Sequence, residues 1–381
     1  MEHRLTLQLI RYEIAQIPVD NDLLEQINDD LLYLVYKFAI EQDVAYIVGS
    51  ALTRLGVLSG DLRTAFFNEQ LGSVYRDEQF RHDTENVSVL FSAQEIKHIM
   101  LKGAVIKGMY PKSEMRTSCD IDILINEDDL EKALNILYDN GYTYVSKTKH
   151  DVMLMTPAQS YVELHYTLNE YEFEADNILK NAWSYTRQKN EWEYEFSEHF
   201  FVFYQISHIA RHMYTGGCGI RAFLDLKIIF DRMKFDKEAL KRLLEKASLA
   251  KFFDTTMRLV NLWFGNSEDI SDELKEYEMY ILKSGIYGNM QNKSSVINEK
   301  GGNRTTYIKS VFFPSYNVMA EKYSVLNKMP YLLPFMYVIR GVQAVFKGKN
   351  TTGVKVIKVS RVVTEDKQNQ VATLLKNLEL M

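Results

Sequence analysis

The chain has 381 residues and a net charge of −6, with 46% hydrophobic and 25% charged residues. This composition is typical of globular proteins, and the negative net charge argues against general nucleic-acid binding. The two cysteines, Cys119 and Cys218, are too few for a disulfide framework, which fits a reducing cytoplasm. We find neither a signal-peptide core nor a run of about 18 uncharged apolar residues, so we expect no transmembrane helix.

Helical periodicity dominates residues 1–96, which we expect to form an N-terminal helical region. Apolar residues recur at helical spacing over 21–43, and further helices are expected around 43–56 and 77–92. No candidate catalytic motif falls in this region.

At residue 97 the pattern changes to short strands and helices. "KHIMLKG" predicts a buried strand that ends at a glycine, "AVIKGMYP" a short helix, and "CDIDILI" a second strand. "NEDDLEKALNILYDNG" predicts a helix with Asn126 as its N-cap and Gly141 just beyond its C-terminus. Three more strands, "YTYVS", "DVMLMT" and "SYVELHY", complete a core over 97–171, and this order indicates an α+β fold.

Helical spacing returns over 172–300, and 301–381 is expected to be a basic, mostly helical C-terminal region. Residues 289–306 are polar and predict a loop or linker, whereas "MPYLLPFMYVIRGVQAVF" predicts a packed helix. Residues 303–362 contain ten Lys and Arg residues and a single acid, Glu321. Such a segment is either a solvated basic face or a surface for a triphosphate, a phosphorylated acceptor or an anionic lipid headgroup.

Two carboxylates lie side by side in the apolar strand "CDIDILI". Asp120 and Asp122 are two residues apart and therefore point to the same face, where they repel each other and resist burial. A divalent cation would neutralise them, and Mg²⁺ prefers oxygen ligands. Glu163, on a strand we expect to be adjacent, offers a third carboxylate. His165 shares its face and is a candidate nucleotide-binding residue. The alternative is a solvated strand surface with a partly buried histidine.

Groups that could bind the phosphates of a substrate are expected just before the aspartates in sequence. Gly103 ends a strand and opens a helix, whose N-terminus can bind an anion, and Lys102 adds a positive charge. Arg116 precedes Asp120 by four residues and could reach a triphosphate. The alternative for Lys102 and Arg116 is ordinary surface charge.

The run "LKGAVIKGMYPKSEMRTSCDIDILI", followed by "VELHY", resembles the nucleotidyltransferase superfamily of DNA polymerase beta type. It looks most like a branch of uncharacterised bacterial nucleotidyltransferases. The resemblance implies a small mixed sheet with flanking helices and an NTP substrate such as ATP, with Mg²⁺ or Mn²⁺ as cofactor. It also implies that Asp120, Asp122 and Glu163 hold the metals and carry catalysis, and that Lys102 and Gly103 grip the phosphates.

A weaker part of the resemblance lies in "HIARHMYTGGCGIRAFLDLKIIF". His208, His212 and Arg221 are candidate substrate contacts there, although helix packing explains them equally simply. The two histidines have zinc-like spacing, but the glutamate of an HExxH motif is absent. Asp225, one helical turn after Arg221, is a candidate partner for that arginine.

We therefore expect transfer of NMP from an NTP to a hydroxyl or phosphate of an unknown small molecule, sugar or protein. A non-catalytic nucleotide-binding or adaptor protein on the same fold is the alternative, because the helix opens with Lys-Gly-Ala where the superfamily has Gly-Gly or Gly-Ser. A phosphohydrolase or kinase-like metal enzyme is a third hypothesis, although kinase signatures are absent.

Overall fold

The chain forms two compact units in a computed structural model. The first comprises Met1–Ala210 and Gly219–Glu278, and the second Arg211–Cys218 and Met279–Met381. We describe each unit by itself, and the division into four regions stays a prediction. The structure describes residues 1–168, 174–267, 271–285, 288, 292, 313–316, 319–320, 323, 325–346 and 365–381.

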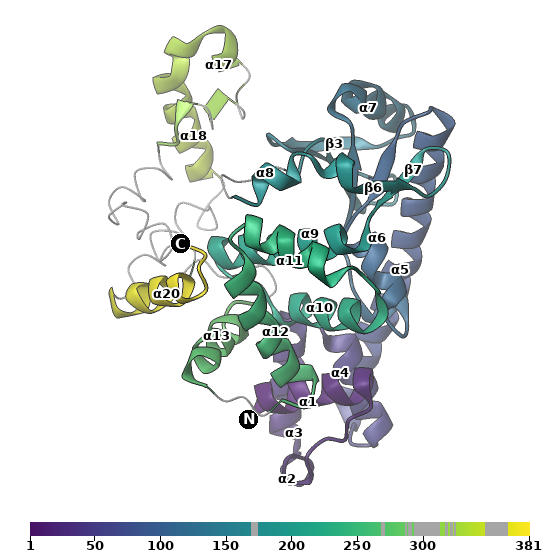
Figure 1. The fold of residues 1–381 in the computed structure, drawn as a ribbon, viewed down its shortest axis with the longest axis vertical. Coiled ribbons are helices and arrows are strands. Elements are labelled where there is room, and N and C mark those ends of the chain that lie inside the picture. The colour runs from purple at the N-terminus through teal and green to yellow at the C-terminus, as the bar shows by residue number, and fades with distance from the viewer. Residues whose placement is uncertain are drawn as a thin grey trace. The chain divides into compact units, whose positions relative to one another are not determined.

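The N-terminal part of the first unit is helical, as the sequence predicts (Figure 1). Asn28 caps α3 by accepting a hydrogen bond from the Leu31 N–H at 2.9 Å. Gly56, at φ +70°, ends α4 in the left-handed conformation. The helices are α1 (Glu2–Ala15), α2 (Asn21–Leu24), α3 (Asp29–Glu41), α4 (Ala45–Leu55) and α5 (Gly60–Ala93).

The helix α5 is much longer than the helix predicted at 77–92. Its 34 residues contact α3 and α4 near one end and α7 and β2 near the other. Several of its buried positions are polar, namely Ser73, Asp77 and Asp83. They interrupt the helical periodicity of apolar residues from which a helix is predicted. This helix links the N-terminal helices to the sheet.

The first unit contains a seven-stranded mixed sheet, which lies beside α5 and α7 (Figure 1) and confirms the predicted α+β class. Its strand order is β3-β4-β5-β2-β1-β7-β6. The strand β2 runs parallel to β5 and antiparallel to β1. The strands are β1 (His98–Met100), β2 (Asp120–Ile125), β3 (Thr143–Lys147), β4 (Asp151–Met155), β5 (Tyr161–His165), β6 (Thr186–Gln188) and β7 (Glu193–Phe196).

The hairpin of β6 and β7 was not expected, because helices were predicted from residue 172 onward. It adds to the sheet through parallel pairing of β7 with β1. Both strands are short and largely polar. The polar and apolar residues of Glu193–Phe196 alternate, but four residues are too few for this period to predict a strand.

The two faces of the sheet are chemically different. Ile121 and Ile123 of β2, with Val162 and Leu164 of β5, belong to a fully buried core cluster that also contains Phe91 of α5. The opposite face carries the acidic residues of β2 and β5, since side chains alternate along a strand. The helix α7 (Leu130–Asp139) covers the apolar face beside α5 and is followed by Gly141 at φ +82°.

Short helices connect the strands. The loop between β1 and β2 contains α6 (Gly103–Ile106) and the 3₁₀ turns η1 (Lys107–Met109) and η2 (Ser113–Met115). The predicted N-cap residue Asn126 precedes η3 (Glu127–Asp129) but makes no capping bond through its side chain. The helix α8 (Asp176–Leu179) and η4 (Ala182–Tyr185) lie before β6.

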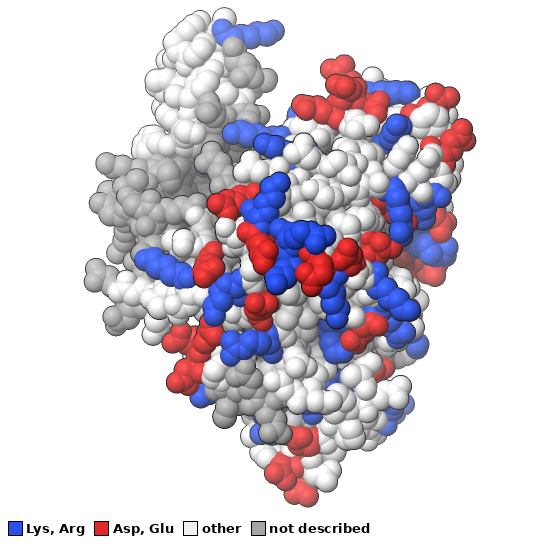
Figure 2. All heavy atoms as spheres, in the orientation of Figure 1, with Lys and Arg blue, Asp and Glu red and all other residues white. Residues whose placement is uncertain are grey.

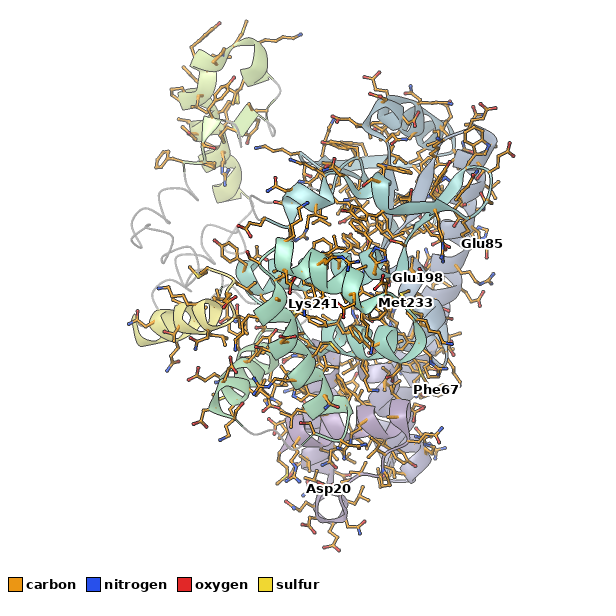
Figure 3. The ribbon with its side chains drawn as sticks, in the orientation of Figure 1. Asp20, Phe67, Glu85, Glu198, Met233 and Lys241 are labelled. Atoms are coloured by element: carbon orange, nitrogen blue, oxygen red, sulfur yellow. The ribbon has the colours of Figure 1, made fainter. Side chains whose placement is uncertain are left out.

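The later helices complete the first unit, and their side chains fill its interior (Figure 3). The helix α12 packs on α1 and α10, and α10 also contacts α6. On the face shown in Figure 2, Lys and Arg side chains lie among Asp and Glu. These helices are α9 (Glu198–Thr215), α10 (Ile220–Arg232), α11 (Lys237–Lys246), α12 (Ala250–Phe264) and α13 (Asp272–Leu282), of which α9 and α13 continue into the second unit.

All the regular secondary structure described in the second unit is helical. Met319, Ala320 and Leu326 form a small buried cluster. The expected loop over 289–306, apart from Asn292, and much of the basic segment over 303–362 lie outside the described residues. None of the described helices combines the length and apolar composition needed to cross a bilayer. The elements are α17 (Val325–Lys328), η5 (Pro330–Leu332), α18 (Leu333–Phe346) and α20 (Glu365–Asn377).

Candidate functional site

The polar face of β2 and β5 carries a group of charged residues that we call the acidic cluster. Parallel pairing places Asp122 directly beside Glu163, and Asp120 beside Tyr161. The sequence predicted that Glu163 lies on a strand adjacent to the aspartates, and the register agrees with this. The acidic cluster consists of Lys102, Asp120, Asp122, Glu163 and His165.

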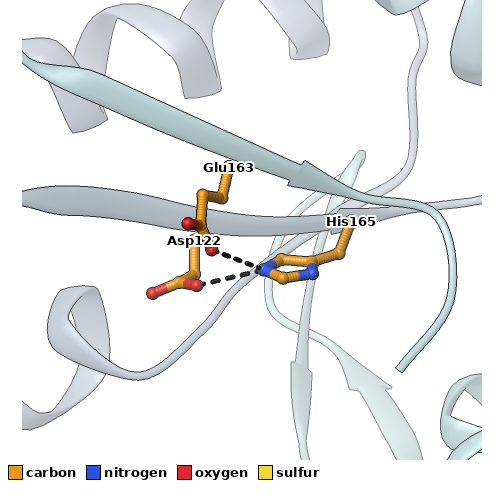
Figure 4. Close-up of side chains that lie close together, drawn as sticks. All are labelled: Asp122, Glu163 and His165. Carbon is orange, nitrogen blue, oxygen red and sulfur yellow. Dashed lines mark hydrogen bonds and ion pairs between the residues drawn. The ribbon is translucent and has the colours of Figure 1, made fainter. Parts of the chain in front are cut away.

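Within the acidic cluster, Asp122, Glu163 and His165 converge most closely (Figure 4). The Nε2 atom of His165 lies 3.0 Å from Asp122 Oδ1 and 3.6 Å from Glu163 Oε2. One ligand atom from each of the three residues lies within 4.8 Å of the others. Asp120, which was expected in this group, lies one step earlier on the same face of β2. His165 takes the third position: it ends β5 opposite Leu124, and its side chain lies on the same face as Glu163 and contacts Asp122.

Lys102 supplies the positive charge at this group. Its Nζ lies 2.7 Å from Asp122 Oδ1, and its backbone has φ +39°, which is uncommon for a residue with a side chain. Burial disfavours the ammonium, but attraction to Asp122 outweighs this and raises the pKa of Lys102. The strained backbone thus places a firmly charged ammonium on the central carboxylate.

The carboxylates respond differently to burial. Burial, reinforced by the neighbouring Asp122 carboxylate, raises the pKa of Glu163 to about 7. Burial would raise the pKa of Asp122 too, but Lys102 and His165 outweigh it and hold that pKa well below its ordinary range. Burial and the charge of Asp122 raise the pKa of Asp120. Asp122 is therefore the fixed negative charge, and its two acidic neighbours resist ionisation.

These residues fit a divalent cation. Three carboxylates face a single ammonium, so the cluster contains more acidic groups than that ammonium can neutralise, and a cation would favour their ionised forms. Carboxylate oxygens suit Mg²⁺, and an imidazole nitrogen beside them also suits Mn²⁺. The buried Nδ1 of His165 has no hydrogen-bond partner among the described residues, whereas a metal-binding histidine usually donates its second ring N–H, so the carboxylates carry the fit more than the imidazole does.

The predicted phosphate grip at Gly103 is constrained by close packing. A Cβ atom at this position would lie 2.6 Å from Ser118 Oγ and 3.0 Å from Arg116 Nη1, so only glycine fits without a shift. The N–H groups of Ala104 and Val105 already donate to the carbonyls of Leu101 and Lys102. Its role in holding phosphates stays a prediction.

Arg116 belongs to a second group, which we call the loop brace. Its Nε and Nη2 donate to the two carboxylate oxygens of Asp225 at 2.9 and 3.0 Å, and Tyr110 donates to the same carboxylate at 2.8 Å. Lys107 bonds to the Arg116 carbonyl at 2.6 Å and to Asp77 at 2.7 Å. The loop brace consists of Asp77, Lys107, Tyr110, Arg116 and Asp225, all buried.

The loop brace changes the interpretation of two predicted residues. The predicted pairing of Asp225 with Arg221 is wrong, because Asp225 takes the guanidinium of Arg116 from the loop and Arg221 contacts Asp43 and the Thr117 carbonyl. Arg116 therefore positions the loop that leads to β2, and its expected contact with a triphosphate stays a prediction. Sequence spacing could not reveal this pairing, since 109 residues separate the partners.

The histidines of α9 are placed differently from each other. His208 is partly buried, with its ring centroid 6.3 Å from that of Tyr204. His212 belongs to the second unit. Their expected contacts with substrate, like that of Arg221, stay predictions.

Tyr204 of α9 is a residue that sequence analysis missed. Its hydroxyl is buried, has no hydrogen-bond partner among the described residues, and interacts electrostatically with Lys102, Asp122 and Glu163. Burial raises the pKa of Tyr204, an effect that Lys102 opposes and Asp122 reinforces. Nothing in its surroundings in sequence distinguishes it from the other aromatic residues, because Phe200, Phe201 and Phe203 precede it as ordinary core.

Comparison with known proteins agrees with this geometry. No curated protein and no solved structure matched the chain. The model of one family, described as "Uncharacterised nucleotidyltransferase", matches residues 32–265, which include every residue of the acidic cluster and of the loop brace. Because this match covers more than half of the chain, the protein belongs to the uncharacterised nucleotidyltransferase family.

Proposed function

We propose that the protein is a Mg²⁺- or Mn²⁺-dependent nucleotidyltransferase. It would move NMP from an NTP to a hydroxyl or phosphate of a small-molecule, sugar or protein acceptor and release pyrophosphate. The observation that carries this proposal is the convergence of Asp122, Glu163 and His165 beside Lys102, in a chain of this family. The basic sequence over 303–362 supports an anionic acceptor.

The acidic residues hold the cation in this proposal. Asp122 and Glu163, with His165 or Asp120, would be its ligands. A divalent cation bound there supplies electrostatic stabilisation of the charge that develops on the transferring phosphoryl group. Asp122 is the anchor, because Lys102 and His165 hold the pKa of its carboxyl group well below the ordinary range and so favour the ionised form.

Two donors are available for the substrate phosphates. Lys102 is an ammonium at the edge of the acidic cluster, and Tyr204 is a hydroxyl with no partner among the described side chains. A hydrogen bond from either group to a phosphate oxygen would be charge-assisted. Together they replace part of the grip that the superfamily obtains from Gly-Gly or Gly-Ser.

Glu163 is also placed to act as a general base. Its pKa of about 7 belongs to the metal-free protein, and a bound cation would favour the ionised carboxylate, which can accept a proton from an attacking hydroxyl. We propose it as the residue that helps to deprotonate the acceptor.

The test is transfer of label from α-³²P-NTP to fractionated small-molecule and protein acceptors, with Mg²⁺ or Mn²⁺ present. Asp122→Asn is expected to lower turnover by about a thousandfold or more, because it removes the anchor charge without changing the shape. Glu195→Gln on β7, which exchanges a half-buried carboxylate paired with Arg187, is the matched control and should keep full turnover. Equal turnover by wild type and Asp122→Asn would refute the proposal.

A non-catalytic nucleotide-binding or adaptor protein is the second candidate. It is favoured by the 2.7 Å contact through which Lys102 already neutralises Asp122, and by the engaged N–H groups at the start of α6. Calorimetry with a non-hydrolysable NTP and Mn²⁺ separates the two. Tight binding with no label transfer to any acceptor would support the adaptor, whereas metal-dependent transfer supports the enzyme.

A further inference from the structure

The second unit exposes a stripe of large apolar side chains on η5 and α18. Tyr331 is 71% exposed, Phe335 69%, Val338 64%, Ile339 40% and Val342 48%. Their spacing of four, three, one and three residues places them on one face of a helix, over about three turns. The sequence predicted a packed helix here, and the structure shows that this face is not packed. We call these five residues the α18 stripe.

The opposite face of α18 determines how the helix is held. Leu333, Met336 and Tyr337 pack against the small core of Met319, Ala320 and Leu326. The Tyr337 hydroxyl also donates to the Pro314 carbonyl at 2.6 Å. Because these contacts fix the rotation of the helix, the α18 stripe faces outward as a property of the fold.

The sequence around the α18 stripe is strongly basic. Between Glu321 and Glu365 there are eight Lys and Arg residues and no acid. Two of them are described in the structure: Lys328 is exposed, and Arg340 is partly buried beside Met319. An apolar helix face combined with basic residues is the pattern of a helix that lies in the interface of an anionic membrane.

A second exposed apolar stripe, on α5, lacks this pattern. Phe67 (Figure 3), Leu71 and Tyr75 are 60%, 59% and 70% exposed at helical spacing. Residues 61–78 around them hold four acids and two basic residues, a local charge of −2. An anionic surface would repel this helix, so equal apolar exposure leads to different expectations at the two sites.

We propose that the α18 stripe docks onto the surface of an anionic lipid bilayer. The 14 residues of α18 span about 21 Å, less than the roughly 30 Å of the hydrocarbon core, and the helix would lie in the plane of the interface. Apolar side chains would enter the acyl boundary, and the positive charge of this part of the sequence, including the exposed Lys328, would attract the anionic lipid phosphates. A second copy of the chain is a poorer occupant, because the like positive charge of this part of the sequence would oppose self-association. This proposal is independent of the chemistry of the acidic cluster.

Co-sedimentation of the full chain with vesicles tests the proposal. We expect binding to phosphatidylcholine vesicles that contain phosphatidylglycerol, weaker binding at high salt, and little binding to pure phosphatidylcholine. Phe335→Asp and, separately, Val338→Asp should each lower the partition coefficient by about tenfold or more, since each puts a carboxylate into the apolar contact. Both side chains are exposed, so neither change removes a core contact.

The matched control is Phe67→Asp, which makes the same chemical change at another exposed phenylalanine, on α5. It should bind vesicles as wild type does. The proposal is overturned if wild type ignores anionic vesicles, or if Phe335→Asp and Val338→Asp bind as wild type does. It is also overturned if sedimentation velocity shows a dimer that these variants dissociate and no vesicle binding occurs, which would assign the stripe to self-association.

Discussion

The acidic cluster and the loop brace are both buried groups of charge, but they differ in balance. The loop brace sets Asp77 and Asp225 against Lys107 and Arg116, so every charge has a partner. The acidic cluster sets three carboxylates against one ammonium. An ion pair offsets the desolvation free energy of a buried charge. Carboxylates in excess lack this compensation until a cation binds to them. Balance therefore distinguishes a structural charge cluster from one suited to binding.

The largest expected effect breaks the balance of the loop brace. Asp225→Asn leaves the buried Arg116 without its carboxylate and should lower the free energy of unfolding by about 3–5 kcal/mol. The matched control, Asp231→Asn, lies on the same helix and removes an exposed pair with Lys227. It should change stability by less than about 0.5 kcal/mol. Urea denaturation measures both, and similar values for the two variants would contradict the assignment of a structural brace.

A substitution in the acidic cluster should lower turnover and leave stability unchanged, the reverse of what is expected in the loop brace. Glu163→Gln is expected to lower turnover by about a hundredfold or more, without loss of stability in the metal-free protein. The raised pKa of Glu163 means that its contribution to stability is present at low pH and is lost as the pH rises through about 7. At pH 8 the amide should therefore match or exceed wild type in thermal unfolding. A clear loss of stability at that pH would show that Glu163 is structural.

Two buried tyrosines provide a smaller and closely matched contrast. Tyr204→Phe removes a hydroxyl without a partner among the described residues, so stability should hold while affinity for NTP falls by about tenfold. Tyr110→Phe removes a donor to Asp225 and should cost about 1–2 kcal/mol of stability with little effect on nucleotide affinity. Calorimetry measures the NTP affinity of both variants, and urea denaturation measures their free energy of unfolding. A loss of stability in Tyr204→Phe with unchanged NTP affinity, as expected for Tyr110→Phe, would contradict a role of Tyr204 in binding.

The smallest expected effect concerns His98, a buried residue outside both groups. Its Nδ1 donates to the Ile96 carbonyl and its Nε2 accepts from the Ser88 hydroxyl, each at 3.0 Å. Burial lowers the pKa of His98, so its contribution to stability is present above about pH 6.5 and is lost as the pH falls through the lower folded-state value. Unfolding of wild type and His98→Gln at pH 8, 6 and 5 should converge at low pH. A constant difference would refute titration of this histidine.

Prediction from the sequence succeeded where a local pattern has a local cause. The strand "CDIDILI" alternates because one face packs on α5 and α7 and the other carries the aspartates, and the structure confirms this strand as β2. The hairpin of β6 and β7 and the full length of α5 escaped prediction. Polar residues such as Asp77 and Asp83 are buried there for reasons set by distant partners, Lys107 and Thr156.

The sequence by itself determined the α+β class and the shared face of Asp120 and Asp122. It also determined that Glu163 lies among apolar residues on a strand, as the two aspartates do. Strand periodicity is a property of neighbouring residues and needs no knowledge of the rest of the chain. Only the tertiary structure decided that His165 and Lys102 join Asp122, that Arg116 is held by Asp225, and that Tyr204 approaches from α9. Those contacts join residues 20 to 109 positions apart, and they are made by strand register and helix packing, which no local spacing encodes.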